Sequence, residues 1–178
     1  MKAILLDRDG TVIVDPPDER VDRVEKIKLF ADSIEALKVL AGHGVGVIFI
    51  TNQAGIAEGR MSEQEFEVIN AEVVRQLAPS EVTVLKTFMC PHGPEDHCEC
   101  RKPKPKLILD ALKEFGLAAG DTYMVGDRQS DIIAGVNAGV KTVLVKTANV
   151  PVESAQADYT APTLLDAVKY VVARLDKA

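Results

Sequence analysis

The sequence has no hydrophobic run long enough to cross a membrane, and it carries no recognisable secretion signal. A membrane-spanning helix needs about 20 consecutive apolar residues, and none of the apolar stretches in this chain of 178 residues approaches that length. No basic segment leads into a hydrophobic stretch near the first residue, as it would in a signal peptide. We therefore expect a soluble, cytoplasmic protein.

An excess of positive charge is also missing. Lys and Arg number 21 against 27 Asp and Glu, which gives a formal net charge of −6. Proteins that bind nucleic acids or anionic membrane surfaces usually carry a basic excess or a basic patch. The charge balance therefore argues against nucleic acid or membrane as the main partner.

Repeats, low-complexity segments and linker-like stretches are absent from the sequence as well. The length suits one ordinary domain, and apolar residues make up 47% of the chain, which is enough for a packed core. We predict a single domain over residues 1–178 that works as a monomer.

The sequence does contain a regular alternation of apolar runs and amphipathic segments. The apolar runs predict buried strands at residues 3–6, 45–50, 82–89, 122–125 and 142–145. Apolar positions at helical spacing predict helices at residues 31–42, 62–77, 105–115, 131–137 and 163–175. The polar stretch 12–29 is typical of a surface loop. This alternation predicts an α/β fold, a Rossmann-like three-layer sandwich around a mostly parallel sheet.

Two carboxylates directly follow the first predicted strand. Asp7 and Asp9 are two residues apart, so they begin on the same side of the chain. Gly10 lets the backbone turn away and approach a ligand closely. Two like charges at this distance resist joint ionisation unless a cation or a shared proton relieves them. The pair therefore indicates a divalent metal, a nucleophile and a proton-transfer group.

Polar motifs also follow two other predicted strands. The second strand ends in Thr51-Asn52-Gln53, and the fourth ends in Gly126-Asp127-Arg128 with Asp131 four residues after Asp127. In open α/β sheets, ligands bind in the crevice beyond the carboxyl ends of the strands. We expect Asp7, Asp9, Thr51 and Asp127 to meet there, with Arg101-Lys102-Pro103 as a further contributor from the start of a helix.

Each of these motifs also has an ordinary structural explanation. Asp131 is as easily a helix cap as a site residue, Thr51-Asn52 alone would more often form a turn, and Arg101-Lys102 alone would more often be a solvated pair. The shared hypothesis is favoured because all the motifs occupy equivalent places in the predicted fold.

The combined chemistry fits phosphoryl transfer. A phosphate monoester needs an in-line nucleophile, a cation for its oxygens and a proton for the leaving alcohol. A carboxylate can serve as nucleophile through an aspartyl-phosphate intermediate. Mg²⁺ prefers carboxylate and phosphate oxygens, which Asp7 and Asp127 can help to supply. Lys102 and the Thr51 hydroxyl can hold the transferring oxygens.

The motifs Asp7-Arg8-Asp9-Gly10-Thr11, Thr51-Asn52-Gln53, Lys102 and Gly126-Asp127-Arg128-x-x-Asp131 together resemble those of the haloacid dehalogenase (HAD) superfamily of phosphatases. The resemblance runs from residue 3 to about residue 145. It implies that Asp7 is the nucleophile and that Asp9 is the general acid and then the base. It further implies Mg²⁺ between the Asp7 carboxylate, the Asp9 carbonyl and Asp127. We expect Asp131 to support this site and Asn52 to contact the substrate.

All three cysteines lie within eleven residues. Cys90, His92, Cys98 and Cys100 supply three thiols and one imidazole, which is a donor set suited to a closed, structural Zn²⁺ site. Residues 91–99 contain no apolar anchor, so a metal would order this loop and fix the Arg101-Lys102 pair after it. The alternative is three unremarkable buried cysteines beside a surface histidine. We expect His97 to be solvated.

The cysteine loop narrows the resemblance to a branch that contains histidinol-phosphate phosphatases and D-glycero-D-manno-heptose 1,7-bisphosphate phosphatases. Only five residues separate His92 from Cys98, a compact loop more similar to the histidinol-phosphatase type. Asp15-Pro16-Pro17 and Val21-Asp22-Arg23 also resemble that type. We therefore take histidinol phosphate as the first expectation and the heptose bisphosphate as the alternative. Resemblance to the heptose branch implies that Arg101 contacts the substrate.

The connections between the first three predicted strands are too short for a large cap domain, so we expect loops alone to cover an open site. Two other classes of function stay open. A phospho-acceptor signalling domain also places acidic residues and a lysine at strand ends, but it has no evident use for the cysteine loop. A zinc-stabilised binding protein without catalysis ranks last, because every motif position holds a competent residue.

Overall fold

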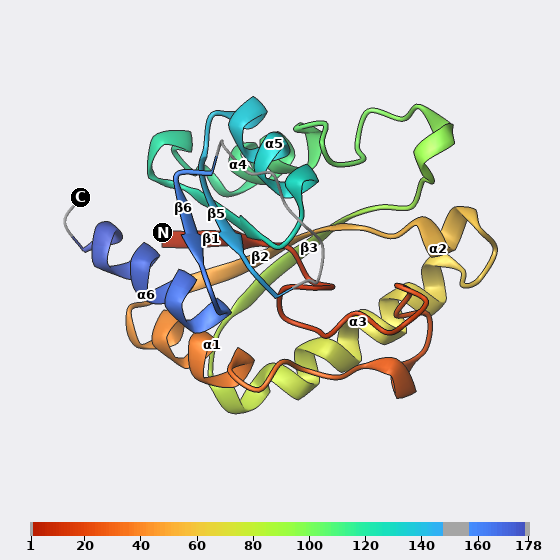
Figure 1. Cartoon of the computed structure of the whole chain (residues 1–178), viewed down its shortest axis with the longest axis horizontal. Coiled ribbons are helices and arrows are strands. Elements are labelled where there is room, and N and C mark those ends of the chain that lie inside the picture. The colour runs from red at the N-terminus through yellow and green to blue at the C-terminus, as the bar shows by residue number, and fades with distance from the viewer. Residues whose placement is uncertain (1, 148–156, 177–178) are drawn as a thin grey trace.

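The computed structural model describes residues 2–147 and 157–176, and these residues form a six-stranded parallel sheet (Figure 1). The strands are β1 (Lys2–Leu6), β2 (Val45–Asn52), β3 (Val84–Cys90), β4 (Tyr123–Gly126), β5 (Lys141–Val145) and β6 (Tyr159–Ala161). They lie in the order β3-β2-β1-β4-β5-β6, and each neighbouring pair is parallel. The direction of the strand order changes between β1 and β4, where open α/β sheets bind their ligands.

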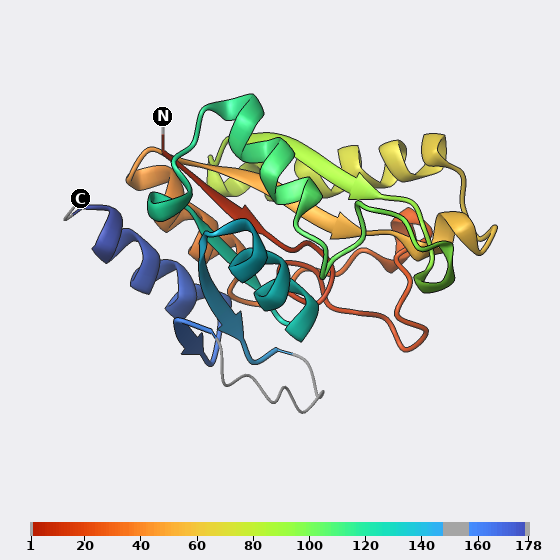
Figure 2. The same ribbon diagram turned by 90° about the horizontal axis from the view of Figure 1, so that it is seen from above.

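Helices cover both faces of this sheet, as Figures 1 and 2 show. The helices are α1 (Ser33–Gly42), α2 (Ala54–Ala57), α3 (Glu63–Leu77), α4 (Lys106–Phe115), α5 (Gln129–Ala138) and α6 (Leu164–Leu175), with short 3-10 turns at Val24–Lys26, Ala78–Ser80, Pro94–Asp96 and Ala119–Asp121. Helices α1, α3 and α6 pack on one face, and α4 and α5 pack on the other. The predicted three-layer α/β sandwich is confirmed.

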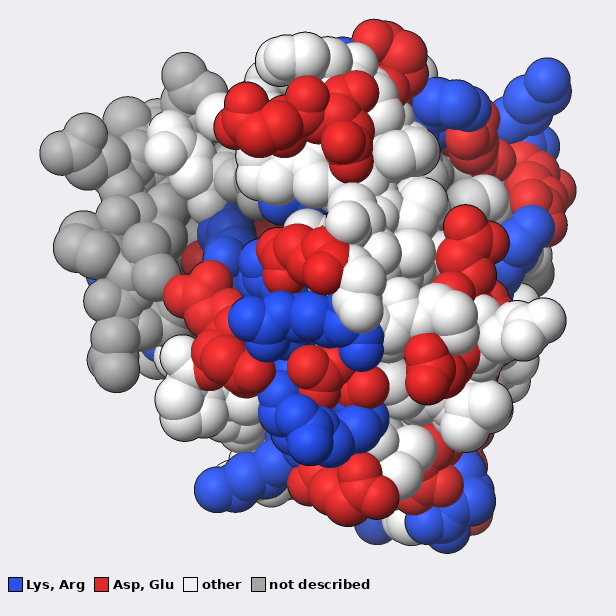
Figure 3. Space-filling model, turned by 90° about the vertical axis from the view of Figure 1, so that its right-hand side faces the viewer, with Lys and Arg blue, Asp and Glu red and all other residues white. Residues whose placement is uncertain are grey.

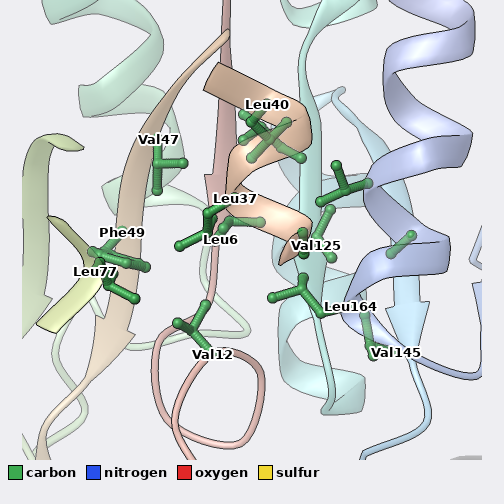
Figure 4. Packing of buried hydrophobic residues seen from close by; sticks show 14 of the residues in the cluster. Leu6, Val12, Leu37, Leu40, Val47, Phe49, Leu77, Val125, Val145 and Leu164 are labelled. Atoms are coloured by element: carbon green, nitrogen blue, oxygen red, sulfur yellow. The ribbon is translucent and has the colours of Figure 1, made fainter. Parts of the chain in front are cut away.

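The central strands are apolar on both sides because both of their faces are buried. In β1, Ile4 and Leu6 belong to the core cluster under α1, α3 and α6, whereas Ala3 and Leu5 belong to the cluster under α4 and α5. Figure 4 shows the first cluster, in which Leu6 of β1 lies close to Leu37 of α1. This double burial explains why the strands appear in the sequence as continuous apolar runs and not as alternating ones.

Two sequence expectations about the elements need correction. The stretch 12–29 lacks a long helix or strand, as predicted, but it is not wholly a surface loop, because Val12, Ile13 and Val21 are buried in the core. The edge strand β6 was not predicted, since three residues are too few to show a periodic pattern. No large cap domain interrupts the described residues, which agrees with expectation.

Because each neighbouring pair is parallel, the carboxyl ends of the strands lie at one edge of the sheet. In Figure 1, β1 and β2 run towards the right, whereas β6 runs downwards. The chain leaves that edge through the segment after β1, the short helix α2 after β2, the cysteine loop after β3 and the start of α5 after β4. Within the described ranges, no helix is both long and apolar enough to span a membrane.

Candidate active site

A buried lysine lies between two carboxylates, one directly after β1 and the other in the first turn of α5. The Nζ atom of Lys102 is 2.8 Å from Asp7 Oδ1 and 2.6 Å from Asp131 Oδ1, and it also donates to the Ile50 carbonyl oxygen at 2.7 Å. All three charged side chains are almost fully buried. Pairing at this depth holds the ammonium in place, because a buried charge without a partner is costly.

Asp131 is both a helix cap and a residue of the site, the two alternatives that its position in the sequence allowed. Its Oδ2 atom accepts the backbone N–H of Arg128 at 2.9 Å, which caps the first turn of α5, while its Oδ1 atom faces Lys102. Gly126 lies beside it, and a Cβ atom there would come within 2.4 Å of the Asp131 carboxyl group. A helix cap therefore also orients the active-site lysine.

Asp127 lies next to this group and has one oxygen without a hydrogen bond. Thr11 donates to Asp127 Oδ1 at 3.0 Å, whereas the buried Oδ2 atom accepts no hydrogen bond from the described residues. The backbone at Gly10 approaches this oxygen so closely that a Cβ atom would lie 2.5 Å from it, and Gly10 has a φ of +85°. The turn predicted at Gly10 is confirmed; the close approach is to Asp127, and the expected approach to a ligand stays a prediction.

The buried charges shift one another's ionisation. Burial raises the pKa of Asp7 well above its usual range, and the charges of Asp131 and Asp127 add to the effect while Lys102 opposes it. Burial, followed by the charge of Asp131, raises the pKa of Asp127 to about 7. Burial disfavours the charge of Lys102, but Asp131 and Asp7 outweigh it and raise the pKa of Lys102. Lys102 therefore stays protonated, but its single positive charge does not balance the buried carboxylates around it.

Asp9 points to a second group of side chains at the same edge. Its carboxylate accepts two hydrogen bonds from the guanidinium of Arg8, at 3.1 and 3.0 Å, and one from Gln53 Nε2 at 2.6 Å. Gln53 also donates to the Thr51 hydroxyl oxygen at 2.8 Å. Since that oxygen accepts from Gln53, the Thr51 hydroxyl hydrogen is available for a phosphoryl oxygen.

Asn52 and Arg101, the two residues expected to contact substrate, differ in their surroundings. The Asn52 side chain donates to the Lys102 carbonyl oxygen at 3.1 Å and accepts the Lys102 N–H at 3.0 Å, so it fixes the backbone of the lysine. Arg101 donates to the His92 carbonyl oxygen at 3.0 Å and forms no ion pair with a described carboxylate. Both line the cavity, and their contact with substrate stays a prediction.

These residues surround a cavity of about 160 Å³. Its floor is formed by Asp7, Asp9, Thr51, Lys102 and Asp131, and its outer wall includes Asp15, Glu19, Arg20, Arg101 and Arg128. The outer residues are largely paired, with Arg128 2.8 Å from Asp15 and Arg20 2.6 Å from Glu58. Figure 3 shows this face of the molecule, where basic and acidic side chains are closely mixed.

The buried carboxylate oxygens of Asp7, Asp131 and Asp127 fit a divalent cation, although Asp127 is not among the residues that line the cavity. Carboxylate oxygens of Asp7, Asp127 and Asp131 lie within 4.8 Å of one another, and Lys102 accounts for an oxygen of Asp7 and one of Asp131. Asp127 Oδ2 has no hydrogen-bond partner among the described residues. A hard cation with oxygen ligands would satisfy this buried atom and offset the excess negative charge. Asp7 and Asp127 are the residues that fit it best.

The four predicted zinc ligands come together in the loop after β3. The Sγ atom of Cys90 is 2.9 Å from Cys100 Sγ and 3.6 Å from Cys98 Sγ. His92 Nδ1 lies 3.3 Å from Cys100 Sγ and 3.6 Å from Cys90 Sγ. All four donor atoms lie within 4.8 Å of one another, as the ligands of one ion must. Zn–S bonds of about 2.3 Å place sulfurs roughly 3.8 Å apart on a tetrahedron; the separations of Cys98 Sγ from Cys90 Sγ and Cys100 Sγ, 3.6 and 3.7 Å, are close to this value, whereas Cys90 and Cys100 lie closer together. The exposed His97 lies outside the cluster, as expected.

The thiols of this cluster are not equivalent. Burial is the main cause that raises the pKa of Cys90. Burial opposes ionisation at Cys98 too, but the backbone N–H of Arg101 and the neighbouring thiols lower its pKa to about 7. A metal must displace protons to bind thiolates, so Cys98 is the thiol that ionises most readily. The backbone N–H of Arg101 contacts Cys98, and Lys102 is the next residue, so the cysteine cluster helps to position the active-site lysine.

Three contributors to the site were not among the predicted site residues. Arg8 and Gln53 hold Asp9, and Thr11 holds Asp127. All three belong to motifs singled out in the sequence. Their partners could not be predicted, because the contacts depend on how separate segments pack or on the direction in which a side chain points. Gln53 has one local signal, because it follows Thr51 by two residues at a strand end and so shares its side.

Comparison with known proteins places the chain among phosphatases. Residues 99–173 match the HAD-hydrolase-like family model. The D-glycero-β-D-manno-heptose-1,7-bisphosphate 7-phosphatase of Pasteurella multocida is 37% identical over 179 residues, which cover 96% of each chain. The histidine biosynthesis bifunctional protein HisB of Legionella pneumophila is 37% identical over 139 residues, which cover 78% of this chain and 40% of that protein.

A solved structure agrees with these sequence relatives. The D,D-heptose 1,7-bisphosphate phosphatase from B. bronchiseptica, complexed with magnesium and phosphate, superposes with a TM-score of 0.87 at 28% identity, covering 98% of this chain and 99% of that one. A relative of 37% identity along almost the whole chain shares its ancestry as well as its fold. This chain therefore belongs to the HAD superfamily of phosphatases, in the branch that contains the heptose bisphosphate phosphatases, and is a phosphoric monoester hydrolase.

Proposed function

We propose that the chain removes the 7-phosphate of D-glycero-D-manno-heptose 1,7-bisphosphate through an aspartyl-phosphate intermediate. The observation that supports this best is the position of Asp7 at the floor of the cavity, with Lys102 on one of its oxygens and Asp9 two residues away. A carboxylate nucleophile, a fixed cation and a second carboxylate for proton transfer are what such a displacement requires.

In the first half of the reaction, an oxygen of Asp7 attacks the phosphorus atom, and the bond from phosphorus to the sugar oxygen breaks. Protonated Asp9 gives its proton to that leaving oxygen. In the second half, Asp9 takes a proton from water, whose oxygen attacks the phosphorus atom of the aspartyl phosphate. The bond to Asp7 then breaks, so inorganic phosphate leaves and Asp7 is restored. Lys102 and the Thr51 hydroxyl hold the phosphoryl oxygens throughout.

We infer that Asp7, Asp127 and the Asp9 carbonyl oxygen hold Mg²⁺ at this floor. When bound, the ion would neutralise phosphoryl charge and reduce repulsion between the phosphate and the carboxylates. In the same proposal, Zn²⁺ at Cys90, His92, Cys98 and Cys100 orders the loop that carries Arg101 and Lys102. We further propose that the chain acts as one domain and as a monomer in the cytoplasm.

Three observations favour the heptose bisphosphate over histidinol phosphate, which reverses the order expected from the loop length. Relatives that match along nearly the whole chain are named for the heptose bisphosphate, whereas the HisB match covers 40% of that protein. Arg101 also offers the cavity a cation without a described ion-pair partner, which suits a second phosphate. The amino group of histidinol would favour an unpaired carboxylate, but Asp15 and Glu19 already pair with Arg128.

The deciding experiment measures phosphate release from heptose 1,7-bisphosphate and histidinol phosphate side by side, with Mg²⁺ present. A preference for the bisphosphate of at least about 100-fold in kcat/KM, or about 2.7 kcal/mol, with the 1-phosphate retained in the product, is expected. An Asp7→Asn preparation serves as the control for contaminating phosphatases.

The opposite preference would restore histidinol phosphate as the substrate. Absence of release from both, by folded and metal-loaded protein, would overturn the proposal and favour the signalling or binding alternatives. Arg101→Gln adds a test of the substrate assignment, because it should reduce kcat/KM for the bisphosphate more than for histidinol phosphate.

A further inference from the structure

Arg8 is a completely buried arginine beside the reacting groups, and the reaction described above gives it no task. Its side chain has 0% exposure and is the largest fully buried side chain among the described residues. An ionised guanidinium at this depth is tolerated only when its donors are satisfied. The partners of Arg8 therefore indicate what its burial achieves.

The main partner of Arg8 is the carboxylate of Asp9. Nε donates to Asp9 Oδ1 at 3.1 Å, and a terminal nitrogen donates to Asp9 Oδ2 at 3.0 Å. Two parallel hydrogen bonds from a planar guanidinium fix the plane of a carboxylate as well as its position. The Asp9 side chain keeps 18% exposure and lines the cavity. Arg8 therefore holds this carboxylate on its buried side and leaves it accessible from the cavity.

The rest of the guanidinium is anchored in the core. Its other terminal nitrogen donates to Asn70 Oδ1 at 3.3 Å, and its central carbon lies 5.0 Å from the centre of the Phe66 ring. Both residues belong to α3. Asn70 is tied in turn to Thr87 of β3 at 3.1 Å. Arg8 thus connects the carboxylate to α3 and β3, neither of which contributes a residue to the lining of the cavity.

We propose that Arg8 is a positioning residue that holds Asp9 in the orientation required for proton transfer to the leaving oxygen. The inference rests on the proposed role of Asp9 as general acid. It assigns to the buried guanidinium an effect on the departure of the alcohol, separate from the binding of the phosphoryl group by Lys102 and Thr51. Arg8 itself stays out of contact with the substrate.

This assignment makes a prediction that a merely structural arginine does not. A sugar alcohol leaves only if it receives a proton, whereas 4-nitrophenolate leaves without one. The ratio kcat/KM reports the steps up to departure of the alcohol and excludes hydrolysis of the intermediate. Loss of Arg8 should therefore lower kcat/KM strongly for the sugar phosphate and only weakly for 4-nitrophenyl phosphate.

The test measures kcat/KM of Arg8→Met and Arg8→Lys on heptose 1,7-bisphosphate and on 4-nitrophenyl phosphate. We expect the loss on the sugar phosphate to exceed the loss on the aryl phosphate by at least tenfold for Arg8→Met. Arg8→Lys keeps the charge without the two-pronged grip, so it should show the same pattern to a smaller degree. Asp9→Asn gives the benchmark for complete loss of the proton donor.

A matched control separates this effect from general loosening of the core. Val73→Ala removes buried volume from the same helix and leaves the hydrogen-bond partners of Asp9, Arg8 and Gln53, unaltered, so it should change kcat/KM for both substrates by the same factor. Equal losses on both substrates in the Arg8 variants would overturn the inference and leave the phosphatase proposal intact. If Arg8→Met does not fold, the same comparison decides with Arg8→Lys. Failure of the unaltered protein on both substrates would instead overturn the proposed function.

Discussion

At the scale of single residues, the site has more buried negative charge than the fold alone can satisfy. Lys102 pairs with Asp7 and Asp131, whereas the nearest cation to Asp127 is the partly exposed guanidinium of Arg128, 3.9 Å away. Burial raises the pKa of both Asp7 and Asp127, which means that their charged forms are disfavoured in the metal-free protein. Such an arrangement lowers stability and serves the binding of a cation and a phosphate.

Replacement of Asp7 tests this trade between stability and activity. We expect Asp7→Asn to lower turnover by at least about 10³-fold, because the nucleophile is lost. Its melting temperature in the absence of metal should not fall, since an amide removes a carboxylate whose charge is disfavoured by burial. Phosphate release and thermal denaturation measure the two effects. Asp110→Asn, at an exposed pair with Lys106, should leave turnover unchanged. Near-normal turnover in Asp7→Asn would contradict the covalent mechanism.

Replacement of Lys102 should have the opposite effect on stability. Lys102→Met leaves Asp7 and Asp131 buried without their shared cation, and removal of one partner from a buried ion pair costs about 3–5 kcal/mol. Denaturant unfolding at pH 7.5 measures this loss, and turnover should fall with it. Lys104→Met removes an exposed lysine that pairs with Glu99, so its free energy of unfolding should change by less than about 1 kcal/mol. Similar values for the two variants would show that the buried pair does not stabilise the fold.

The residues proposed to react could be predicted from the sequence more fully than the residues that hold them in position by hydrogen bonds. Asp7, Asp9, Thr51 and Asp127 follow apolar strands, and a parallel sheet brings such positions to one edge. Arg8 was not predicted as a partner of Asp9, because its contacts also depend on α3, which is more than fifty residues away in the chain. The expected substrate contact of Asn52 did not anticipate its two hydrogen bonds to Lys102. Such contacts require the packing of separate elements to be known.

At the scale of elements, the long strands and helices followed from their patterns, and the exceptions were short or irregular. The strand β6 has three residues, too few for a periodic signal. In the stretch after Asp9, Val12 and Ile13 are buried although the segment is not a regular element. Their burial depends on packing under α1 and α3, which no local pattern in a polar stretch reveals.

The cysteine loop is the element whose structure depends most on a ligand. We expect that removal of zinc disorders residues 90–100 and lowers activity, because these residues contribute little to the apolar core and directly precede Arg101 and Lys102. Cys98→Ser should lower the zinc content, speed up proteolysis within the loop and reduce turnover.

The matched variant for this loop is His97→Ala, which alters an exposed neighbour outside the cluster. It should keep zinc content, protease resistance and turnover close to those of the unaltered protein. Full activity in protein verified to contain no zinc would show that the loop is ordered without the metal.

At the scale of the whole molecule, the active-site charges should make stability depend on pH and on Mg²⁺ together. The folded, metal-free protein has a pKa of about 7 at Asp127, against an ordinary value near 3.9 in the unfolded chain. As pH rises through this window, the unfolded chain has already lost the proton that the folded state keeps. The contribution of Asp127 to stability therefore decreases as pH rises from about 4 to 7.

Mg²⁺ should reverse this loss, because it binds the ionised carboxylates of the folded state and so shifts the unfolding equilibrium. We expect the rise in melting temperature caused by a saturating concentration of Mg²⁺ to be larger at pH 8 than at pH 5.5, where protons compete for Asp7 and Asp127. Asp127→Asn should lose most of the rise at pH 8, whereas Asp110→Asn should keep it. The difference between melting curves with and without Mg²⁺ at each pH cancels the titration of distant carboxylates. An equal rise at both pH values would mean that the ion binds elsewhere on this acidic molecule, and the assignment of Asp7 and Asp127 as its ligands would fail.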